Sequence, residues 1–364
     1  MNAALNSVIY PLSFLFVLSL IVVIHEFGHF IAARLCGVDV EEFSFGFGRV
    51  LYQRSDKRGT AWKICALPLG GYVKMLGDSD PASAKPDEKV KEFTEEEKKR
   101  AFFFQNVWKK LFIIVAGPGM NYVLAIVLLT GFYSVYGVIT VPPVISEVMR
   151  ESAAEKAGLA VGDRIVRING KEIVDFTQVR RVVQLDSVLD IVVDRAGKEV
   201  ALQAKISHET GGAVLGITAN AKAEDLKKVS FFKAFVQSLE DTWDLTVDTV
   251  VVLKRIVTRQ RSTEDMRGPL GIAEASGDAF REGLESFLLF IVQVSVGIGF
   301  VNLLPIPILD GGHIMIYTIE AVIRRPLSQK MQTFALSVGM VFLLGLLVLT
   351  SWNDIVRIFQ RLFG

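Results

Sequence analysis

Four long stretches without a charged side chain limit what this chain can fold into. They cover residues 1–24, 111–146, 286–309 and 331–353. Each is at least as long as the roughly 20-residue helix that crosses about 30 Å of hydrocarbon. Because backbone polar groups in hydrocarbon have no water to bind, each stretch is predicted to form a transmembrane helix. Hydrophobic residues make up 51% of the chain, which is typical of a membrane protein.

The first stretch has the length of a signal peptide, but its flanks favour a retained helix. It lacks a basic leading region and a small-residue cleavage site, and its apolar run continues into a segment that carries histidines. Secretory signals are not built in this way. We therefore expect this stretch to remain as the first transmembrane helix.

Charges in the connecting segments predict the orientation. By the positive-inside rule, the segment after the first stretch and the short loop before the fourth are cytoplasmic, so both termini are outside. Arg357 and Arg361 in the tail oppose this orientation. It is supported by Arg34, Lys98, Lys99, Arg100, Lys109, Lys110, Arg324, Arg325 and Lys330. No disulfide is expected, because thiols stay reduced in the cytoplasm and the two cysteines lie in or beside its loop, at Cys36 and Cys65.

The cytoplasmic segment contains an apolar part and a charged part. Residues 63–76 have the apolar content and the Gly70–Gly71 break of a short hairpin or loop that dips toward the membrane. Residues 78–100 are rich in Asp, Pro, Lys and Glu, which predicts a mobile linker followed by a short charged helix. In the second stretch, Gly117 and Asn121 suit either helix packing or a functional site.

Short β-type runs between residues 138 and 220 indicate a small inserted domain. Residues 154–170, AEKAGLAVGDRIVRING, resemble the helix, turn and strand of bacterial PDZ domains. Leu215, Gly216 and Ile217 resemble the loop with which that family binds a peptide carboxylate. A domain that binds nothing and acts as a steric lid is the alternative.

Residues 225–261 carry apolar side chains at helical spacing. Phe231, Phe232, Phe235 and Leu239 fall on one side of such a helix. That pattern predicts a helix on the outer membrane surface, and packing against the inserted domain explains it equally well.

A zinc-hydrolase motif, His25-Glu-Phe-Gly-His29, lies near the end of the first stretch. Histidines four apart on a helix project from one face, so both imidazoles can reach one metal ion, and Glu26 can contact its water. Ionisable side chains within an apolar span are costly and usually functional. The alternative is a polar helix end that reaches the membrane interface.

A catalytic zinc needs a third protein ligand and an open position. Two prolines and two glycines break the end of the third stretch, where Asp310 supplies a carboxylate. Asp310 as a ligand satisfies both the metal and the cost of burying a charge. His313, one turn further on, is the rival ligand, and His208 in the inserted domain is expected to be a surface histidine.

These motifs resemble the paired signature of site-2 proteases, in particular the bacterial regulator of sigma-E protease group. The resemblance rests on His25-Glu-Phe-Gly-His29 and on Asn302-Leu-Leu-Pro-Ile-Pro-Ile-Leu-Asp-Gly311. It extends to Gly117-Pro-Gly-Met-Asn121, to the Gly70-Gly-Tyr-Val-Lys74 segment and to the PDZ-like insertion, and so covers nearly the whole chain. The best-known members carry two PDZ domains in tandem, whereas this chain has room for one.

The resemblance implies an intramembrane protease with one Zn²⁺ per chain. The expected ligands are His25, His29 and Asp310, with Glu26 as the general base. Asn302 is expected to bind the substrate backbone or the oxyanion, and the strand edge at Gly70, Gly71, Tyr72 and Val73 to pair with the unwound substrate. Further candidate substrate contacts are Asn121, Pro305 and Pro307. The implied substrates are single-span proteins already shortened outside, such as anti-sigma factors, or leftover signal peptides.

Two other functions fit parts of the pattern. A metal-binding transporter also needs buried histidines and an aspartate, but the fourth stretch offers almost no polar path. A PDZ-bearing adaptor without activity needs no His-Glu-x-x-His helix. The net charge of +1 gives no reason to expect a nucleic-acid partner, so lipid and membrane-protein substrates are the expected partners, and the sequence leaves the oligomeric state open.

The predicted fold class is a multi-pass α-helical membrane protein of the bacterial inner membrane. It has four transmembrane helices, a membrane-associated β-hairpin or loop and one inserted α+β PDZ-like periplasmic domain. The transmembrane helices are placed at 1–35, 110–137, 285–319 and 331–352. Between and after them lie a cytoplasmic loop (36–109), the PDZ-like domain (138–222), a periplasmic amphipathic segment (223–284), a short cytoplasmic loop (320–330) and a tail (353–364).

Overall fold

The computed structural model describes residues 2–79, 88–139, 141–185, 188–206, 215–219, 226–258, 266–325 and 327–363. Its chain divides into two compact units. The first contains Met1–Leu129, Asp241–Thr246 and Met266–Gly364, and the second contains Thr130–Glu240 and Val247–Asp265.

In the described part of the chain, four helices are long and apolar enough to cross a membrane, as the sequence predicted. They are α1 (Asn2–Leu35), α3 (Val107–Tyr136), α8 (Leu284–Leu303) and α10 (Gln329–Phe363). Helix α3 ends where Gly137 takes a left-handed φ of 90°, and α10 continues well past the predicted span. The third predicted span, 285–319, differs from the structure because two helices occupy it, α8 and α9 (Asp310–Ile323).

The break between α8 and α9 is a tight turn that folds back onto the first turn of α9. Ile308 takes a φ of 95°, an uncommon conformation for a β-branched residue. A Cβ on Gly311 would lie 2.0 Å from the Leu304 carbonyl oxygen, and one on Gly312 would lie 2.5 Å from that of Ile306. Only glycines therefore allow this approach, which brings Asp310 to the start of α9.

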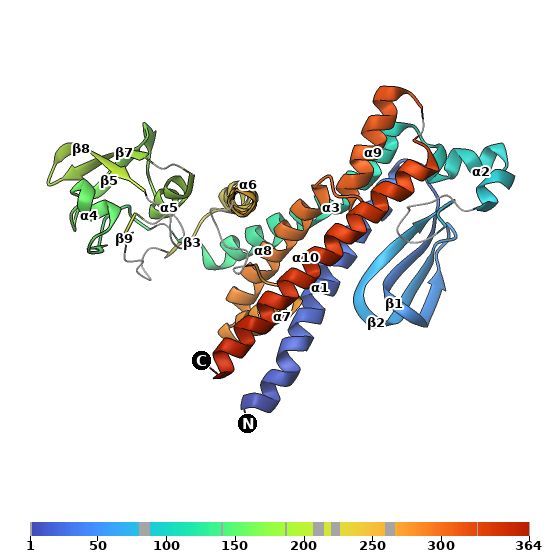
Figure 1. The fold of residues 1–364 in the computed structure, drawn as a ribbon, viewed down its shortest axis with the longest axis horizontal. Coiled ribbons are helices and arrows are strands. Elements are labelled where there is room, and N and C mark those ends of the chain that lie inside the picture. Colours follow the sequence, from blue (N-terminus) through green and yellow to red (C-terminus); the bar gives the residue numbers. More distant parts are fainter. Residues whose placement is uncertain are drawn as a thin grey trace. The chain divides into compact units, whose positions relative to one another are not determined.

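Strands β1 (Val40–Ser55) and β2 (Ala61–Met75) form a long, curved hairpin (Figure 1). Residues 42–45 of β1 lie between two parts of β2: they pair with 71–74 on one side and with 61–64 on the other. Residues 61–64 also pair with 52–55 of β1. Residues 71–75 consequently form an outer edge of the sheet. The sequence predicted only the region 63–76 as a hairpin, so strand β1 was missed.

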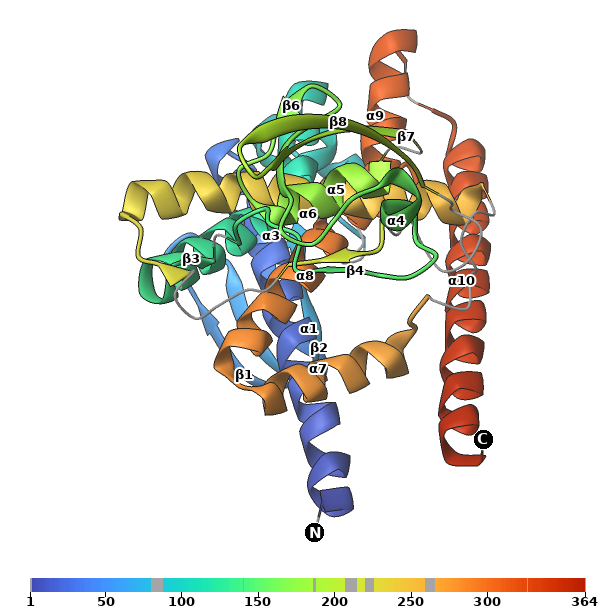
Figure 2. The ribbon, with the colours of Figure 1, turned by 90° about the vertical axis from the view of Figure 1, so that its left-hand side faces the viewer.

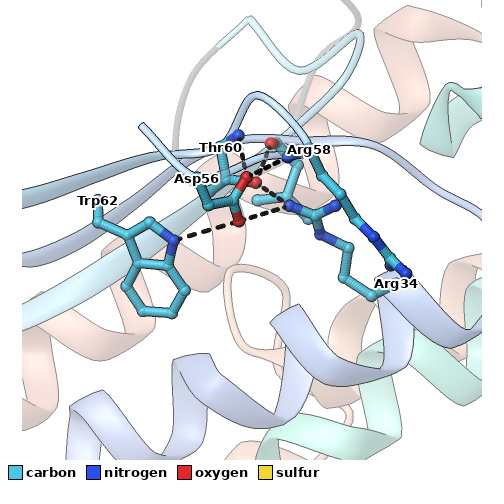
Figure 3. A network of polar contacts seen from close by, with 6 residues as sticks. Arg34, Asp56, Arg58, Thr60 and Trp62 are labelled. Atoms are coloured by element: carbon cyan, nitrogen blue, oxygen red, sulfur yellow. Dashed lines mark hydrogen bonds and ion pairs between the residues drawn. The ribbon is translucent and has the colours of Figure 1, made fainter. Parts of the chain in front are cut away.

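A polar network ties the hairpin turn to the end of α1 (Figure 3). The Asp56 carboxylate accepts hydrogen bonds from the backbone N–H groups of Arg58 (2.8 Å) and Thr60 (3.0 Å) and pairs with Arg34 (3.1 Å). Partial burial opposes ionisation of Asp56, but these hydrogen bonds outweigh it and hold the pKa of the carboxyl below its usual range. The turn is thereby fixed one helical turn beyond the histidine motif.

Strand β2 also packs against the middle of α1. A Cβ on Gly70 would lie 2.9 Å from the Val22 side chain, and one on Gly71 would lie 2.3 Å from the Ser44 carbonyl oxygen. Ser19 donates a hydrogen bond to the Pro68 carbonyl oxygen. The Gly-Gly pair therefore lets the sheet edge lie against the helix that carries the histidines.

The charged segment after the hairpin contains the short helix that the sequence predicted. The described part contains the 3₁₀ helices η1 (Glu88–Glu92) and η2 (Phe102–Phe104) and the short helix α2 (Glu95–Arg100). Thr94 and Glu97 form a capping box at the start of α2. Asp78 is buried and accepts a hydrogen bond from the Met75 N–H (2.9 Å). The predicted charged helix exists, whereas residues 80–87 of the predicted linker lie outside the described residues.

The described part of the predicted outer segment 223–284 contains α6 (Phe231–Val257), the helix expected within 225–261, and a further helix, α7 (Pro269–Glu282). The buried carboxylate of Asp354 in α10 accepts hydrogen bonds from the N–H groups of Gly268 (3.1 Å) and Gly271 (2.8 Å) at the start of α7. Helix α10 otherwise stands to one side of α1 and α8 (Figure 2). The Asp354 contacts therefore tie α10 to α7, and Gln332 ties its first turn to Glu320 of α9.

The second unit is a small α+β fold. A four-stranded sheet has the order β6-β5-β7-β8, and a second pair joins β4 to β9. These elements are β4 (Glu147–Val148), β5 (Arg164–Ile168), β6 (Lys171–Glu172), β7 (Val188–Arg195), β8 (Lys198–Lys205), β9 (Ile217–Thr218), α4 (Ala153–Ala157) and α5 (Phe176–Leu185). Strands β3 (Val138–Ile139) and β10 (Leu226–Lys227) pair next to α3 and α6. An apolar core that includes Ile165, Leu189 and Ile191 holds the sheet to its helices.

Candidate metal centre

His25 and His29 lie one turn apart on the buried face of α1. Their side chains are about one-tenth exposed or less, and their Nε2 atoms lie 3.2 Å apart. The rings meet edge to face, with centroids 4.9 Å apart. The four-residue spacing of the motif thus directs both imidazoles toward one point, as helical geometry requires.

Asp310 reaches the same point from the start of α9. Its Oδ2 lies 3.0 Å from His25 Nε2, and its Oδ1 lies 3.5 Å from His29 Nε2. One ligand atom from each of the three side chains lies within 4.8 Å of the other two. Among the residues that the structure describes, this is the group of His, Cys, Asp and Glu side chains that could hold a metal ion.

Helix α3 supports both histidines from behind. His29 Nδ1 lies 2.9 Å from the Ile113 carbonyl oxygen, and His25 Nδ1 lies 3.3 Å from Asn121 Nδ2. A Cβ on Gly117 would lie 2.2 Å from His29 Nε2 and 2.9 Å from His25 Nε2. Gly117 therefore lets α3 pack directly against both imidazoles of the candidate site.

The donor set fits a zinc ion. The Ile113 carbonyl can only accept, so a neutral His29 carries its proton on Nδ1 and presents an Nε2 lone pair to the centre. A lone pair that faces a carboxylate is repelled unless a cation lies between them. Two imidazoles and one carboxylate are a known ligand set for catalytic zinc, and a hydrogen bond that orients the other ring nitrogen is the usual support.

Glu26 and Asn302 lie beside this group, on the wall of a cavity of about 260 Å³. Val73 and Met75 of the sheet edge and Ile308 of the strained turn line the same cavity. The Val73 backbone also makes a hydrogen bond to the Glu26 carboxylate. The cavity thus brings together the motif glutamate, the three-ligand group and an exposed strand edge.

Other predicted site residues lie at or near this cavity. His313 lines the cavity but stands outside the three-ligand group, with its ring stacked on Tyr317. Tyr72 turns away to donate a hydrogen bond to Glu42 (2.8 Å), and burial together with this bond raises the pKa of Tyr72 to about 12. Pro305 and Pro307 belong to the turn before Asp310.

Predicted residues of the inserted domain lie in the second unit. The Gly216 carbonyl oxygen accepts a hydrogen bond from the Met149 N–H (2.8 Å), and that of Leu215 accepts one from Ala154 (2.8 Å). Ile217 begins β9. His208 lies outside the described residues.

The sequence did not predict three residues that lie next to the site. Ile113 acts through its backbone, so its side chain carries no signal. The strain at Ile308 and the burial of Phe102 beside the cavity arise from tertiary packing. The two prolines around Ile306 were the available signal for the strained turn.

Two histidines and an aspartate beside a motif glutamate are the side chains of a zinc metalloprotease site, and the comparisons agree with this class. The family model described as peptidase family M50 matches residues 13–346. This chain therefore belongs to the site-2 protease family of zinc metalloproteases, and it is a membrane protein with a zinc cofactor.

Relatives similar to this chain carry matching names. A protein of Mesorhizobium japonicum, named as a zinc metalloprotease, is 37% identical over 94% of this chain and 97% of its own length. Metalloprotease MmpA of Caulobacter vibrioides is 33% identical over 95% of both chains. Regulator of sigma-E protease RseP of Salmonella typhimurium is 28% identical over 95% of this chain and 98% of its own.

Proposed function

We propose that this zinc metalloprotease hydrolyses peptide bonds within the transmembrane segments of single-span proteins, after a first cleavage outside the membrane. One observation carries the proposal: His25, His29 and Asp310 converge beside Glu26 on a cavity framed by the apolar helices α1 and α8. A substrate for such a site must itself enter the bilayer. Anti-sigma factors and leftover signal peptides belong to this class.

In the proposed mechanism, His25, His29 and Asp310 hold the zinc ion and Glu26 moves the proton. When bound, zinc supplies Lewis acidity that polarises a carbonyl and activates water near neutral pH. The Glu26 carboxylate accepts a proton from the water that attacks the peptide carbonyl carbon. As the C–N bond breaks, Glu26 returns this proton to the leaving amine nitrogen.

Asn302 is proposed to donate its amide N–H to the substrate. It stands in the last turn of α8 and lines the cavity opposite the histidine helix. An amide donor at that place can stabilise negative charge on the carbonyl oxygen as it develops. Pro305 and Pro307 are proposed to shape the adjoining wall by keeping the turn extended.

The sheet edge at residues 71–75 is proposed to hold the unwound substrate. A transmembrane helix hides its amides, so a scissile bond becomes accessible only when the helix opens. Residues 71–74 pair with β1 on one side only, and Val73 reaches the cavity beside Glu26. Strand addition there would offer backbone partners next to the proposed base.

The second unit is proposed to be a PDZ-like periplasmic domain. In support, α4, the turns at Gly158 and Gly162 and strand β5 follow the order of helix, turn and strand expected for residues 154–170. It would either exclude bulky uncut substrates or bind new carboxyl termini at Leu215–Ile217.

Excision of residues 141–219, which keeps the β3–β10 pair, distinguishes these two roles. If the domain excludes uncut substrates, its loss should permit their cleavage. If the domain binds new carboxyl termini, its loss should lower the cleavage of all substrates.

The proposed topology places the hairpin and α2 in the cytoplasm and the second unit outside. Phe231, Phe232, Phe235 and Leu239 of α6 are exposed, which supports a helix on the outer membrane surface. Thr130, six residues before the end of α3, shares a 2.8 Å hydrogen bond with Ser238 of α6, so this part of α6 lies near the end of a span.

Labelling of single cysteines that replace Arg58 or Lys198 tests this topology. An impermeant reagent added from outside should reach only the cysteine at position 198, and the reverse pattern would overturn the topology.

Cleavage of a model single-span substrate by the purified protein and its Glu26→Gln variant tests the proposed chemistry. We expect the variant to keep one zinc per chain and to lose cleavage, because the amide cannot accept the proton. Bound zinc and cleavage are measured on the same preparation. Undiminished cleavage by Glu26→Gln would eliminate Glu26 as the base.

A further inference from the structure

Asn121 lies in α3 against the back of His25. Its side chain is fully buried, and its Nδ2 atom lies 3.3 Å from His25 Nδ1. Among the described residues, His25 lines the cavity and Asn121 does not. The side chain that the sequence suggested as a substrate contact therefore faces a proposed metal ligand instead.

The contact requires a choice of proton position on His25. If the Asn121 NH₂ group donates to Nδ1, the single proton of a neutral imidazole sits on Nε2. That Nε2 faces Asp310 Oδ2 at 3.0 Å and His29 Nε2 at 3.2 Å. A protonated Nε2 has no lone pair for a metal ion, so binding of zinc by His25 requires the proton on Nδ1.

The amide oxygen of Asn121 supplies the acceptor that this proton needs. Asn121 Oδ1 is buried and has no hydrogen-bond partner in the described part of the chain. The amide oxygen and nitrogen exchange places by a half-turn about the last side-chain bond, and their assignment follows from the hydrogen-bond network. After this half-turn, Oδ1 accepts a hydrogen bond from His25 Nδ1–H.

His29 independently supports this proton position, because its Nδ1 also faces an acceptor on α3, and that acceptor is a carbonyl oxygen that cannot donate. The Ile113 carbonyl oxygen lies 2.9 Å away and fixes the proton on Nδ1. Ile113 and Asn121 are eight residues apart on α3 and therefore share one face. The same face of α3 would thus orient both histidines in the same tautomer.

Asn121 is held firmly enough for this role. Ser295 of α8 donates a hydrogen bond to its main-chain oxygen (2.9 Å). A Cβ on Gly299 would lie only 3.1 Å from Asn121 Cβ, so α8 closes on this residue. These contacts hold the backbone and Cβ of Asn121 against α8, with its amide beside His25.

We propose that Asn121 is a positioning residue whose amide oxygen accepts a hydrogen bond from His25 Nδ1–H and so keeps Nε2 free for zinc. The inference rests on the proposed role of His25 as a ligand. Carboxylates and carbonyls commonly support zinc-bound histidines in this way, and their loss typically costs about 10–100-fold in metal affinity. An aspartate should therefore replace Asn121, and an apolar residue of the same shape should not.

The test is the zinc dissociation constant of the purified full chain, measured against a competing chelator. Asn121→Leu should weaken zinc binding by about 10–100-fold, whereas Asn121→Asp, which can only accept, should stay close to the unchanged protein. Gly119→Ala is the matched control in α3, because nothing lies within 4 Å of the added Cβ. Cobalt-substituted protein gives a second readout: its visible absorption bands should shift in Asn121→Leu and persist in Asn121→Asp.

Each other outcome overturns the inference or its premise. If Asn121→Asp binds zinc more weakly than Asn121→Leu, the Asn121 amide donates. If Asn121→Leu binds zinc as the unchanged protein does, the residue only packs. If His25→Ala also retains zinc, the proposed ligand set fails rather than the role of Asn121. Thermal unfolding of the zinc-free variants identifies any variant that fails to fold. The cobalt spectra of the variants that do fold then show whether the Asn121 amide oxygen supports His25.

Discussion

Glycines set how closely the helices of the metal centre approach one another. A Cβ on Gly28 would lie 2.2 Å from the Ala116 carbonyl oxygen, and one on Gly117 would reach both imidazoles. Gly311 and Gly312 have the same effect where the α8–α9 turn meets Asp310. Contacts this short leave no room for any side chain, so these residues place the proposed ligands although they carry no functional group.

Gly117→Ala should displace the His29 imidazole and lower the zinc content of the purified protein. The added methyl group would lie 2.2 Å from Nε2, in the space between α3 and the proposed ligands. Gly119→Ala adds the same methyl group to the same helix in open space. Metal analysis of both variants checks this, and equal zinc in the two would show that the contact at Gly117 is relaxed at no cost to the site.

Asp163 in the second unit gives a pH prediction. Its buried carboxylate accepts hydrogen bonds from Arg195 Nε and Nη2 (both 2.7 Å) and from the Ala160 N–H (2.9 Å). The Arg195 bonds first, and the Ala160 bond second, hold the pKa of Asp163 below its usual range. A lowered folded-state pKa stabilises the fold above about pH 4, and this contribution is lost as the pH falls through the folded value.

Asp163→Asn should therefore destabilise the second unit by about 1–3 kcal/mol at neutral pH and flatten its stability profile below about pH 4. The full chain is unfolded in urea, and protease cleavage within β7 and β8 measures the unfolded fraction of this unit. Arg167→Gln is a suitable control, because its ion pair with Glu199 is exposed on both sides. A variant profile parallel to that of the unchanged protein would contradict the assignment.

The sheet edge connects the hairpin to the proposed chemistry. Residues 42–45 bind 71–74 in an antiparallel register, and this places Val73 against Phe43. The Val73 side chain is buried while its backbone bonds to Glu26. A sheet edge that lies more than 40 residues after the histidine motif in the sequence thus supplies backbone groups at the cavity.

Val73→Pro should cut turnover without lowering zinc content, because proline removes the edge N–H that bonds the Glu26 carboxylate and that an added strand would share. Val73→Ala is the matched control, since it shortens the same buried side chain and keeps the N–H. Cleavage rate and bound zinc are measured for both variants. Turnover that falls equally in the two would assign the loss to packing and reject strand addition.

Elements differ in how far the sequence predicts them. The four long helices follow from charge-free length alone, and the closeness of the two histidines follows from helical spacing. Strand β1 was missed because its pairing partners lie in β2, up to 35 positions further along. The start of α7 was not predicted, and the N–H groups of Gly268 and Gly271 there donate to Asp354, a carboxylate more than 80 residues further along the chain. Such long-range contacts leave no local periodicity to read.

In the whole molecule, membrane helices and the metal centre depend on each other. Helices α1 and α9 supply the three-ligand group, while α3 orients it and α8 adds Asn302. Burial of two imidazoles and a carboxylate among apolar helices is costly unless a cation pairs with them. Membership of the site-2 protease family and the zinc cofactor are consistent with that need.

Zinc analysis of the purified protein with Asp310→Ala as the variant tests the ligand assignment most directly. The unchanged chain should hold one zinc, and Asp310→Ala should lose both the metal and cleavage of a single-span substrate. His313→Ala, which alters the same cavity outside the three-ligand group, should keep its zinc. Retention of zinc by Asp310→Ala together with its loss from His313→Ala would contradict the proposed centre.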